Sequence, residues 1–281
     1  MYRGRTLSLS FPPFTKVVKW LILINAGILL LMTLMKVTNE DVYDAFRAIF
    51  GLVPYLVVRG WIWQLVSYSF LHEGILHLLF NMLGLWMFGA QFEQDWGPKK
   101  FLEFYFFCVI GAALTTIAVS YTGIGGVSPL TKTVGASGGV FGILMAFGMI
   151  YGDREIMLFP IPFSIKAKYF VAGIAFITLV EAIGASQGHG EAVAYSAHLG
   201  GLLFGFLYVK FVPKRGLALS TSEHYFGVRN SYYRWRRRRA AKKFEVYMRK
   251  HNRTVHFDEH GNYVPPDDKK DNGGSKSGWV N

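Results

Sequence analysis

Long apolar runs constrain this chain more than any other feature of its sequence. A membrane-spanning helix needs about 17–25 mostly apolar residues. Six segments meet or approach that requirement, at residues 20–35, 75–92, 101–121, 136–151, 169–185 and 192–209. Only 17% of the residues are charged, against roughly 25% in a soluble domain. The sequence therefore predicts an all-α membrane protein with six transmembrane helices.

The lysines and arginines of the short loops predict an orientation, because cytoplasmic loops carry an excess of them. The basic residues before the first segment, after the second, after the fourth and after the sixth fall on one side. The opposite side holds only Lys36, Arg47, Arg59 and Lys132. Both termini are therefore expected in the cytoplasm, in a multi-pass protein of a bacterial inner (plasma) membrane. No small-residue cleavage site follows the first apolar run, so we expect an uncleaved helix.

Composition predicts three parts along the chain. Residues 1–15 form a cytoplasmic N-terminal segment, residues 16–212 the six-span domain, and residues 213–281 a basic cytoplasmic tail. Within the domain, residues 37–70 begin too polar to span and become rich in tryptophan, tyrosine and leucine. Aromatic residues favour the headgroup zone, so we expect this first loop to be partly helical and to lie at the outer interface.

The tail supplies most of the net charge of +12, since 16 Lys and Arg against 7 Asp and Glu follow residue 213. Residues 234–253 place Ala240, Ala241, Phe244, Tyr247 and Met248 on one helical face. This pattern predicts a basic amphipathic helix on an anionic lipid surface, although a solvated run of charge has the same composition. Nucleic acid is not expected as a partner, because the tail is tethered to a membrane bundle. The residues after this helix are expected to be disordered.

Polar groups at membrane depth are costly, so each suggests a function. His77 and Asn81 in the second segment lie four residues apart, which puts them on one helix face. His72 lies near the outer end of the same segment. Histidine and asparagine also join helices through hydrogen bonds, so these residues alone leave a structural role open.

The second cluster is Gly135-Ala136-Ser137-Gly138-Gly139, followed by Phe141 and Gly142, at the start of the fourth segment. A serine among glycines at a helix N-terminus suits a nucleophile, because small neighbours admit a substrate backbone and free N–H groups can stabilise an oxyanion. The same glycines also match the G-x-x-x-G pattern of helix packing. Either interpretation is open from this cluster alone.

The third cluster is Ala197-His198-Leu199-Gly200-Gly201 with Gly205, early in the sixth segment. Gly201 and Gly205 predict a groove in which another helix packs closely. The second, fourth and sixth segments all start at the outer side. His77, Asn81, Ser137 and His198 are therefore expected to meet in one pocket in the outer half of the membrane.

Together these residues resemble the rhomboid family of intramembrane serine proteases. The match covers about residues 15–212 and rests on His77-x-x-x-Asn81, Gly135-Ala-Ser137-Gly138 and Ala197-His198-x-x-Gly201-x-x-x-Gly205. The Glu93…Gly97-x-Lys99 run also resembles the family pattern. The resemblance implies a six-transmembrane-helix rhomboid-like bundle carrying a basic C-terminal extension.

The resemblance also implies roles for single residues. Ser137 would be the nucleophile and His198 the general base of a dyad, with no cofactor and no metal. The backbone N–H of Ser137, the Asn81 amide and the His77 imidazole would hold the oxyanion. The supporting residues would be Gly135, Gly138, Phe141, Gly201, Gly205 and His72. Substrates would be single-span membrane proteins, and the oligomeric state is not predicted.

Two positions depart from the family pattern. Phe141 stands where many members have tyrosine, and its ring can still stack on the catalytic histidine. Trp63-Gln64 stands where many members have Trp-Arg, so an arginine contact would be missing from the first loop.

Two other functions are compatible with parts of the sequence. A catalytically inactive relative that binds membrane clients would usually lack the serine or the histidine, and this chain has both. A channel or transporter would use His77, Asn81 and His198 as a polar path. Acidic residues such as Glu181 are rare within the segments, and the polar groups lie on one side, which argues against such a path.

Overall fold

The computed structural model describes residues 12–123, 128–157, 164–184, 192–212, 217–253, 255–258 and 262–264. The chain forms two compact units, Met1–Gly216 and Leu217–Asn281. The first unit contains the long apolar helices, and the second contains the basic tail. Each unit is described separately below.

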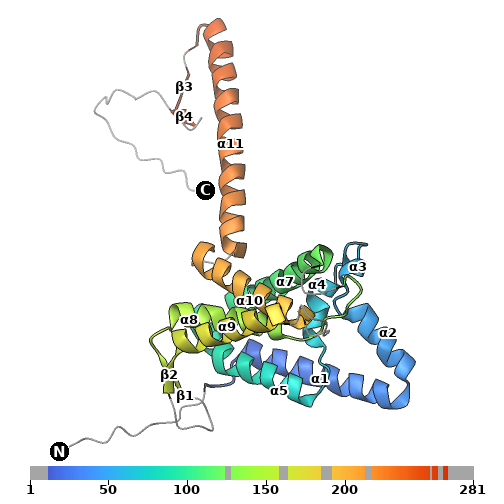
Figure 1. The fold of residues 1–281 in the computed structure, drawn as a ribbon. Helices are drawn as coiled ribbons and strands as arrows, with labels where there is room; N and C mark the ends of the chain where they lie inside the picture. The colour runs from blue at the N-terminus through green and yellow to red at the C-terminus, as the bar shows by residue number, and fades with distance from the viewer. Residues whose placement is uncertain are drawn as a thin grey trace, which may run out of the picture. The chain divides into compact units, whose positions relative to one another are not determined.

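The first unit is a bundle of apolar helices (Figure 1). The long helices are α1 (Lys16–Thr38), α5 (Ile75–Gly84), which continues through the π-helical turn η2 (Leu85–Gly89) into α6 (Ala90–Trp96), α7 (Pro98–Thr122), α8 (Ser137–Ile150), α9 (Ala167–Gly184) and α10 (Ala192–Phe211). Each of the six predicted segments coincides with one of these helical stretches to within a few residues. The prediction of an all-α membrane bundle is therefore confirmed.

Three of the described helical stretches are long and apolar enough to cross a membrane, namely Lys16–Thr38, Ile75–Trp96 and Pro98–Thr122. The first has 23 residues, which at 1.5 Å per residue gives about 34 Å and exceeds a hydrocarbon layer of about 30 Å. Helix α8 is apolar but has only 14 residues. The count of six spans remains a prediction.

The first loop is largely helical, as predicted. It contains α2 (Glu40–Phe50), α3 (Pro54–Val57), α4 (Gln64–Ser67) and the 3-10 turn η1 (Tyr68–Phe70). Gln64 is fully buried, accepts a hydrogen bond from Val53 N, and donates to the carbonyls of Ala48 and Ile49. Trp63 Nε1 also donates to Ile49 O. Gln64 therefore joins the start of α4 to the end of α2 and to the backbone of Val53.

Helix α7 packs against α8 and α10. Its buried face includes Phe101, Phe104, Tyr105 and Cys108. Helices α8, α9 and α10 lie side by side (Figure 1). The connection from α8 to α9 includes a short antiparallel hairpin of β1 (Glu155–Met157) and β2 (Ser164–Lys166).

A buried carboxylate joins the start of α1 to α6. Glu93 is 5% exposed. It accepts hydrogen bonds from Thr15 Oγ1 and from the backbone N–H groups of Val17 and Val18, at 2.5 to 3.0 Å. The first N–H groups of a helix have no partner within the helix, and they favour a negative charge. Glu93 therefore caps α1 from a distant part of the chain.

We predict that Glu93→Ala lowers the free energy of unfolding by about 2–4 kcal/mol, because hydrogen bonds to a charged group contribute about 1.5–3 kcal/mol each. The thermal unfolding midpoint of detergent-purified protein measures the change. Glu40→Ala is the matched control, since Glu40 lies exposed in the first turn of α2. Equal midpoints for the two variants would contradict the capping role.

The second unit contains α11 (Leu217–Lys250) and an antiparallel hairpin of β3 (His256–Phe257) and β4 (Tyr263–Val264). The helix begins well before the predicted residue 234 and ends three residues before 253. The prediction of disorder directly after the helix is wrong for this hairpin. Asp258 accepts hydrogen bonds from the backbone and side chain of Asn262, and these bonds close the turn. The predicted disorder beyond Val264 falls outside the described residues.

Candidate active site

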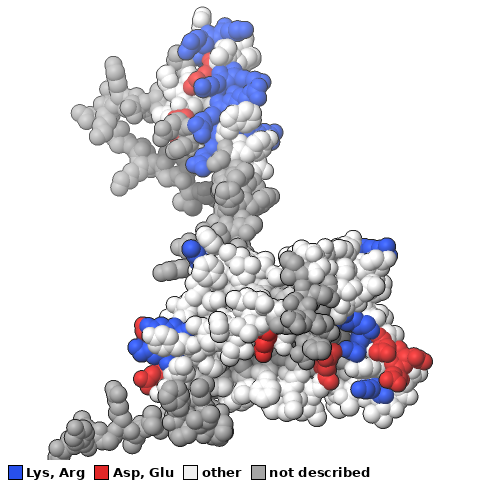
Figure 2. All heavy atoms as spheres, viewed as in Figure 1, with Lys and Arg blue, Asp and Glu red and all other residues white. Residues whose placement is uncertain are grey.

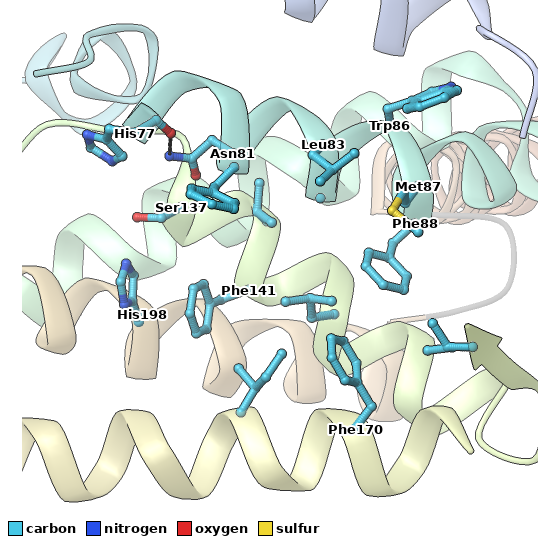
Figure 3. Close-up of a pocket in the computed structure, with 16 residues that line it drawn as sticks. His77, Asn81, Leu83, Trp86, Met87, Phe88, Ser137, Phe141, Phe170 and His198 are labelled. Carbon is cyan, nitrogen blue, oxygen red and sulfur yellow. Dashed lines mark hydrogen bonds between the residues drawn. The ribbon is translucent and has the colours of Figure 1, made fainter. Parts of the chain in front are cut away.

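His77 and Asn81 lie one turn apart on α5, as their spacing predicts. Asn81 is 6% exposed, and its Nδ2 donates to His77 O at 2.8 Å. Figure 3 shows both side chains at the same end of a cavity as Ser137 and His198. An asparagine amide has two N–H donors, so the bond to His77 O leaves one donor of Asn81 for another acceptor.

Ser137 is the first residue of α8. Gly135, two residues earlier, has φ +126°, and a Cβ atom there would lie 2.8 Å from His77 Nε2. Its N–H donates to Tyr68 O, which ties the turn to the first loop. The turn therefore requires glycine for both its conformation and its space. The N–H groups of the first turn of α8 have no partner within the helix.

Helix α8 is short for a helix that crosses a membrane. At 14 residues it is about 21 Å long, which is less than a hydrocarbon layer of about 30 Å. Gly135 and Ala136, directly before Ser137, are buried, which is the arrangement that irregular backbone at membrane depth requires.

His198 lies on α10 and stacks on Phe141 of α8. The ring centroids are 4.1 Å apart and the rings are 5° from parallel. The stack orients the imidazole without adding a hydrogen-bonding group. The structure records no hydrogen bond between Ser137 Oγ and a ring nitrogen of His198, although both residues line the same cavity. Such bonds often tighten only when substrate is bound.

Glycines bring α8 and α10 into backbone contact. A Cβ atom at Gly201 would lie 2.2 Å from Gly138 O, and one at Gly205 would lie 2.5 Å from Gly142 O. The helix-packing interpretation of the glycines around Ser137 is therefore confirmed. They form a small-residue packing interface, and this interface holds the helix of Ser137 against the helix of His198.

The cavity has a volume of about 620 Å³. One end carries the polar groups of His77, Asn81, Ser137 and His198 (Figure 3). The remaining lining is mostly apolar and comes from α5, η2, α8, β1 and α9: Phe80, Leu83, Gly84, Trp86, Met87, Phe88, Val140, Phe141, Leu144, Ile156, Phe170 and Ile174. This size and composition are typical of sites that bind mostly apolar ligands.

His72 lies beside the cavity residues rather than in the lining. It is 1% exposed, and its ring centroid is 5.0 Å from that of His77. Burial, with His77 close by, lowers the pKa of His72 to about 4, so the ring is neutral at neutral pH. Among the residues that the structure describes, no group of three or more His, Cys, Asp or Glu is placed to hold a metal ion.

The sequence did not reveal two contributors to the site. Tyr68 is buried, donates to Val109 O, and accepts from Gly135 N through its carbonyl. It joins the first loop, α7 and the turn before Ser137. The π-helical turn η2 supplies Trp86, Met87 and Phe88 to the cavity wall. Such a turn has no clear sequence signature, although it occurs frequently at functional sites.

Comparison with known proteins agrees with this architecture. The Rhomboid domain family matches residues 59–215, which is more than half of the chain and includes all four polar residues of the cavity. The chain belongs to the rhomboid family.

Individual relatives are 26–32% identical to this chain over the matched residues. Rhomboid protein 1, mitochondrial, of Saccharomyces cerevisiae is 30% identical over 151 residues, which are 54% of this chain and 42% of that protein. Rhomboid protease GluP of Bacillus subtilis is 32% identical over 185 residues, which are 64% of this chain and 31% of that protein. Rhomboid protease GlpG of Yersinia pestis is 26% identical over 156 residues, which are 52% of this chain and 46% of that protein. The matches span less than half the length of these relatives.

Proposed function

We propose that this chain is an intramembrane serine endopeptidase that hydrolyses peptide bonds in or near the transmembrane segments of membrane proteins. The observation that carries the proposal is that Ser137 and His198 line one cavity of an apolar helical bundle, with His77 and Asn81 at the same end. Two of the relatives described above are named rhomboid proteases, which supports the reaction class.

In the proposed reaction, Ser137 Oγ attacks the carbonyl carbon of the scissile peptide bond. His198 takes the Ser137 proton during the attack and returns it to the leaving amine. The acyl group remains on Ser137 until water, deprotonated by His198, attacks the ester and releases the second product. The stack on Phe141 would hold the imidazole in one plane through both steps.

The tetrahedral oxyanion needs preorganised donors where the charge develops. The backbone N–H of Ser137 lies at the start of α8, where the helix dipole also favours negative charge. The second amide hydrogen of Asn81 and the imidazole of His77 are the two side-chain donors at this end of the cavity. The bond from Asn81 to His77 O fixes the orientation of the amide and therefore of its remaining donor.

The apolar part of the cavity supports the proposed class of substrate. A transmembrane segment presents apolar side chains, and the cavity wall that leads away from Ser137 offers apolar contacts from α5, η2, α8 and α9. We therefore propose single-span membrane proteins as substrates. Small residues at the cleavage site would let the substrate backbone approach the glycines around Ser137.

We also propose an orientation and a location. The predicted excess of basic residues places both termini in the cytoplasm and opens the polar end of the cavity to the outer half of the membrane. The relatives include bacterial proteins and one that is named mitochondrial. A bacterial inner (plasma) membrane is the proposed location.

Cleavage of a fluorescent transmembrane reporter by purified protein, in detergent and in lipid nanodiscs, tests the proposal. We expect cleavage within or next to the apolar segment, with the new termini located by mass spectrometry. A fluorophosphonate is expected to label Ser137. If neither cleavage nor labelling occurred with several reporters in lipid, the inactive, client-binding function would replace the proposal.

We predict that Asn81→Ala lowers kcat/KM for the reporter about 10²–10³-fold, the usual effect of losing one oxyanion donor. Asn25→Ala is the matched control. Asn25 is also buried and makes the same intrahelical bond, from Nδ2 to Leu21 O at 2.8 Å, but it does not line the cavity. The control is expected to keep its activity. Similar losses in the two variants would indicate that Asn81 acts through helix stability rather than on the oxyanion.

A further inference from the structure

The tail unit buries only part of the apolar face that the sequence assigned to the membrane. Ala241 of α11 is 7% exposed, and the ring of Phe244 lies 6.2 Å from that of Phe257 in β3. Met248, one turn further along the same face, is partly buried. The hairpin therefore packs on this side of the helix, while Phe244 remains 46% exposed and Tyr247 58% exposed.

The opposite face of α11 is basic and aromatic. Tyr232 and Trp235 stack with ring centroids 6.1 Å apart, and the Arg239 guanidinium lies 5.3 Å from the Trp235 ring centroid. Arg236, Lys243, Val246 and Lys250 share this face, because they follow at helical spacing of three, four or seven residues. All of these side chains are exposed. We call these seven residues the basic face.

The basic face carries no acidic residue. Between Tyr232 and Lys250 the helix has one carboxylate, Glu245, and it follows the buried Ala241 by one turn. The negative charge of Glu245 therefore lies away from Arg236, Arg239 and Lys243. Figure 2 shows the blue basic side chains gathered along this part of the helix. A surface of this kind attracts an anionic partner.

We propose that the basic face binds the anionic lipid headgroups of the leaflet at which α10 ends. Arginine and lysine are attracted to the negative surface potential of such a leaflet. Tryptophan and tyrosine are favoured at headgroup level. The face has only one exposed aliphatic side chain, Val246, so binding is peripheral and mainly electrostatic rather than by deep insertion.

The covalent connection favours lipid over a free polyanion. Helix α11 begins at Leu217, six residues after α10 ends at Phe211. A helix of 34 residues is about 51 Å long, so the length of the tail limits how far the basic face can lie from the bilayer. Tethering raises the effective concentration of the membrane for the tail, whereas a nucleic acid would have to bind from dilute solution.

A label on the basic face of the full-length protein tests the proposal. Val246 is 57% exposed, and Val246→Cys accepts an environment-sensitive nitrobenzoxadiazole label. The native Cys108 is buried, and the unsubstituted protein measures its background labelling. In nanodiscs with about a third phosphatidylglycerol we expect blue-shifted emission and at least about threefold slower dithionite quenching than in phosphatidylcholine alone. High salt should abolish the difference, because it screens charge.

Two triple variants, each carrying the Val246→Cys label, distinguish an effect of the basic face from an effect of net charge. Arg236→Gln/Arg239→Gln/Lys243→Gln is expected to remove the lipid dependence. The control variant replaces the same number of basic residues elsewhere on the same helical segment, Arg234, Arg237 and Arg238, by glutamine. It should keep the lipid dependence. Circular dichroism verifies that α11 remains helical in both variants. A label at the exposed His256, on the hairpin side, is expected to stay equally quenchable in both lipids.

Three results would overturn the proposal. The first is equal quenching of the Val246 label in both lipid compositions. The second is equal loss of protection in the two triple variants, which would make net charge, rather than this face, responsible. The third is a response to single-stranded RNA in phosphatidylcholine nanodiscs without any response to anionic lipid, which would identify a nucleic-acid surface.

Discussion

Replacing Ser137 by alanine is expected to abolish reporter cleavage, with a loss of at least about 10⁴-fold in kcat, because removing the nucleophile of a serine hydrolase removes the covalent step. His198→Ala should cost about as much. Without the His198 imidazole, Ser137 loses its proposed general base. The rates of initial cleavage in lipid nanodiscs, compared at equal amounts of folded protein, measure both effects.

The double variant distinguishes a dyad from two independent contributions. Residues that act as one unit show strongly non-additive losses, so Ser137→Ala/His198→Ala should be no slower than either single variant. Ser120→Ala is the matched control. Ser120 is also buried, bonds only within its own helix to Ile117 O, and does not line the cavity. Cleavage that persists in Ser137→Ala at the rate of the unsubstituted protein would exclude Ser137 as the nucleophile.

The second large effect is expected from Gly201→Ala, which adds one methyl group to α10. That methyl carbon would lie 2.2 Å from Gly138 O. Because the obstacle is backbone rather than a flexible side chain, α8 and α10 must separate. We expect the free energy of unfolding to fall by about 3 kcal/mol or more. Activity should fall with it, since the separation moves Ser137 away from His198.

Gly173→Ala provides the matched control on α9. It makes the same substitution within a helix, and a Cβ atom there would have nothing within 4 Å. Alanine is intrinsically better than glycine in a helix by about 0.5–1 kcal/mol, so this variant should be unchanged or slightly more stable. Denaturation midpoints in detergent and cleavage rates test the pair. If Gly201→Ala were as stable and active as Gly173→Ala, the contact between α8 and α10 would not hold the site together.

The basic tail shows what sequence periodicity can predict and what it cannot. The spacing of Ala240, Ala241, Phe244, Tyr247 and Met248 predicted an apolar helix face, because helical period is a local property. It could not show which of these side chains are buried: Ala241 is 7% exposed, whereas Phe244 is 46% and Tyr247 58% exposed. The hairpin that contains Phe257 lies in a segment whose composition is typical of disorder, and only its packing on Phe244 reveals it.

The first loop gives a second example. The sequence suggested that Gln64, in place of arginine, removes a contact. In the structure Gln64 is buried and makes hydrogen bonds to Val53, Ala48 and Ile49. An amide that both donates and accepts can satisfy partners that a guanidinium, which only donates, cannot. Which partners surround a side chain depends on the path of the chain, and no local pattern encodes that path.

The sequence by itself determined the class of fold and the candidate reactive groups. The length of the apolar runs predicts helices of membrane dimensions. Because polar groups at membrane depth are costly, the polar residues within those runs are candidates for function, namely His77, Asn81, Ser137 and His198. These are properties of single segments, so they can be read without knowing how the segments pack.

Only the tertiary structure decided how those segments combine. It brings Gly138 against Gly201, stacks Phe141 on His198, and connects Glu93 to the start of α1. Each of these contacts joins residues that are far apart in the chain and depends on shape complementarity between helices. Close packing of this kind is a property of two surfaces together, and neither helix sequence specifies it alone.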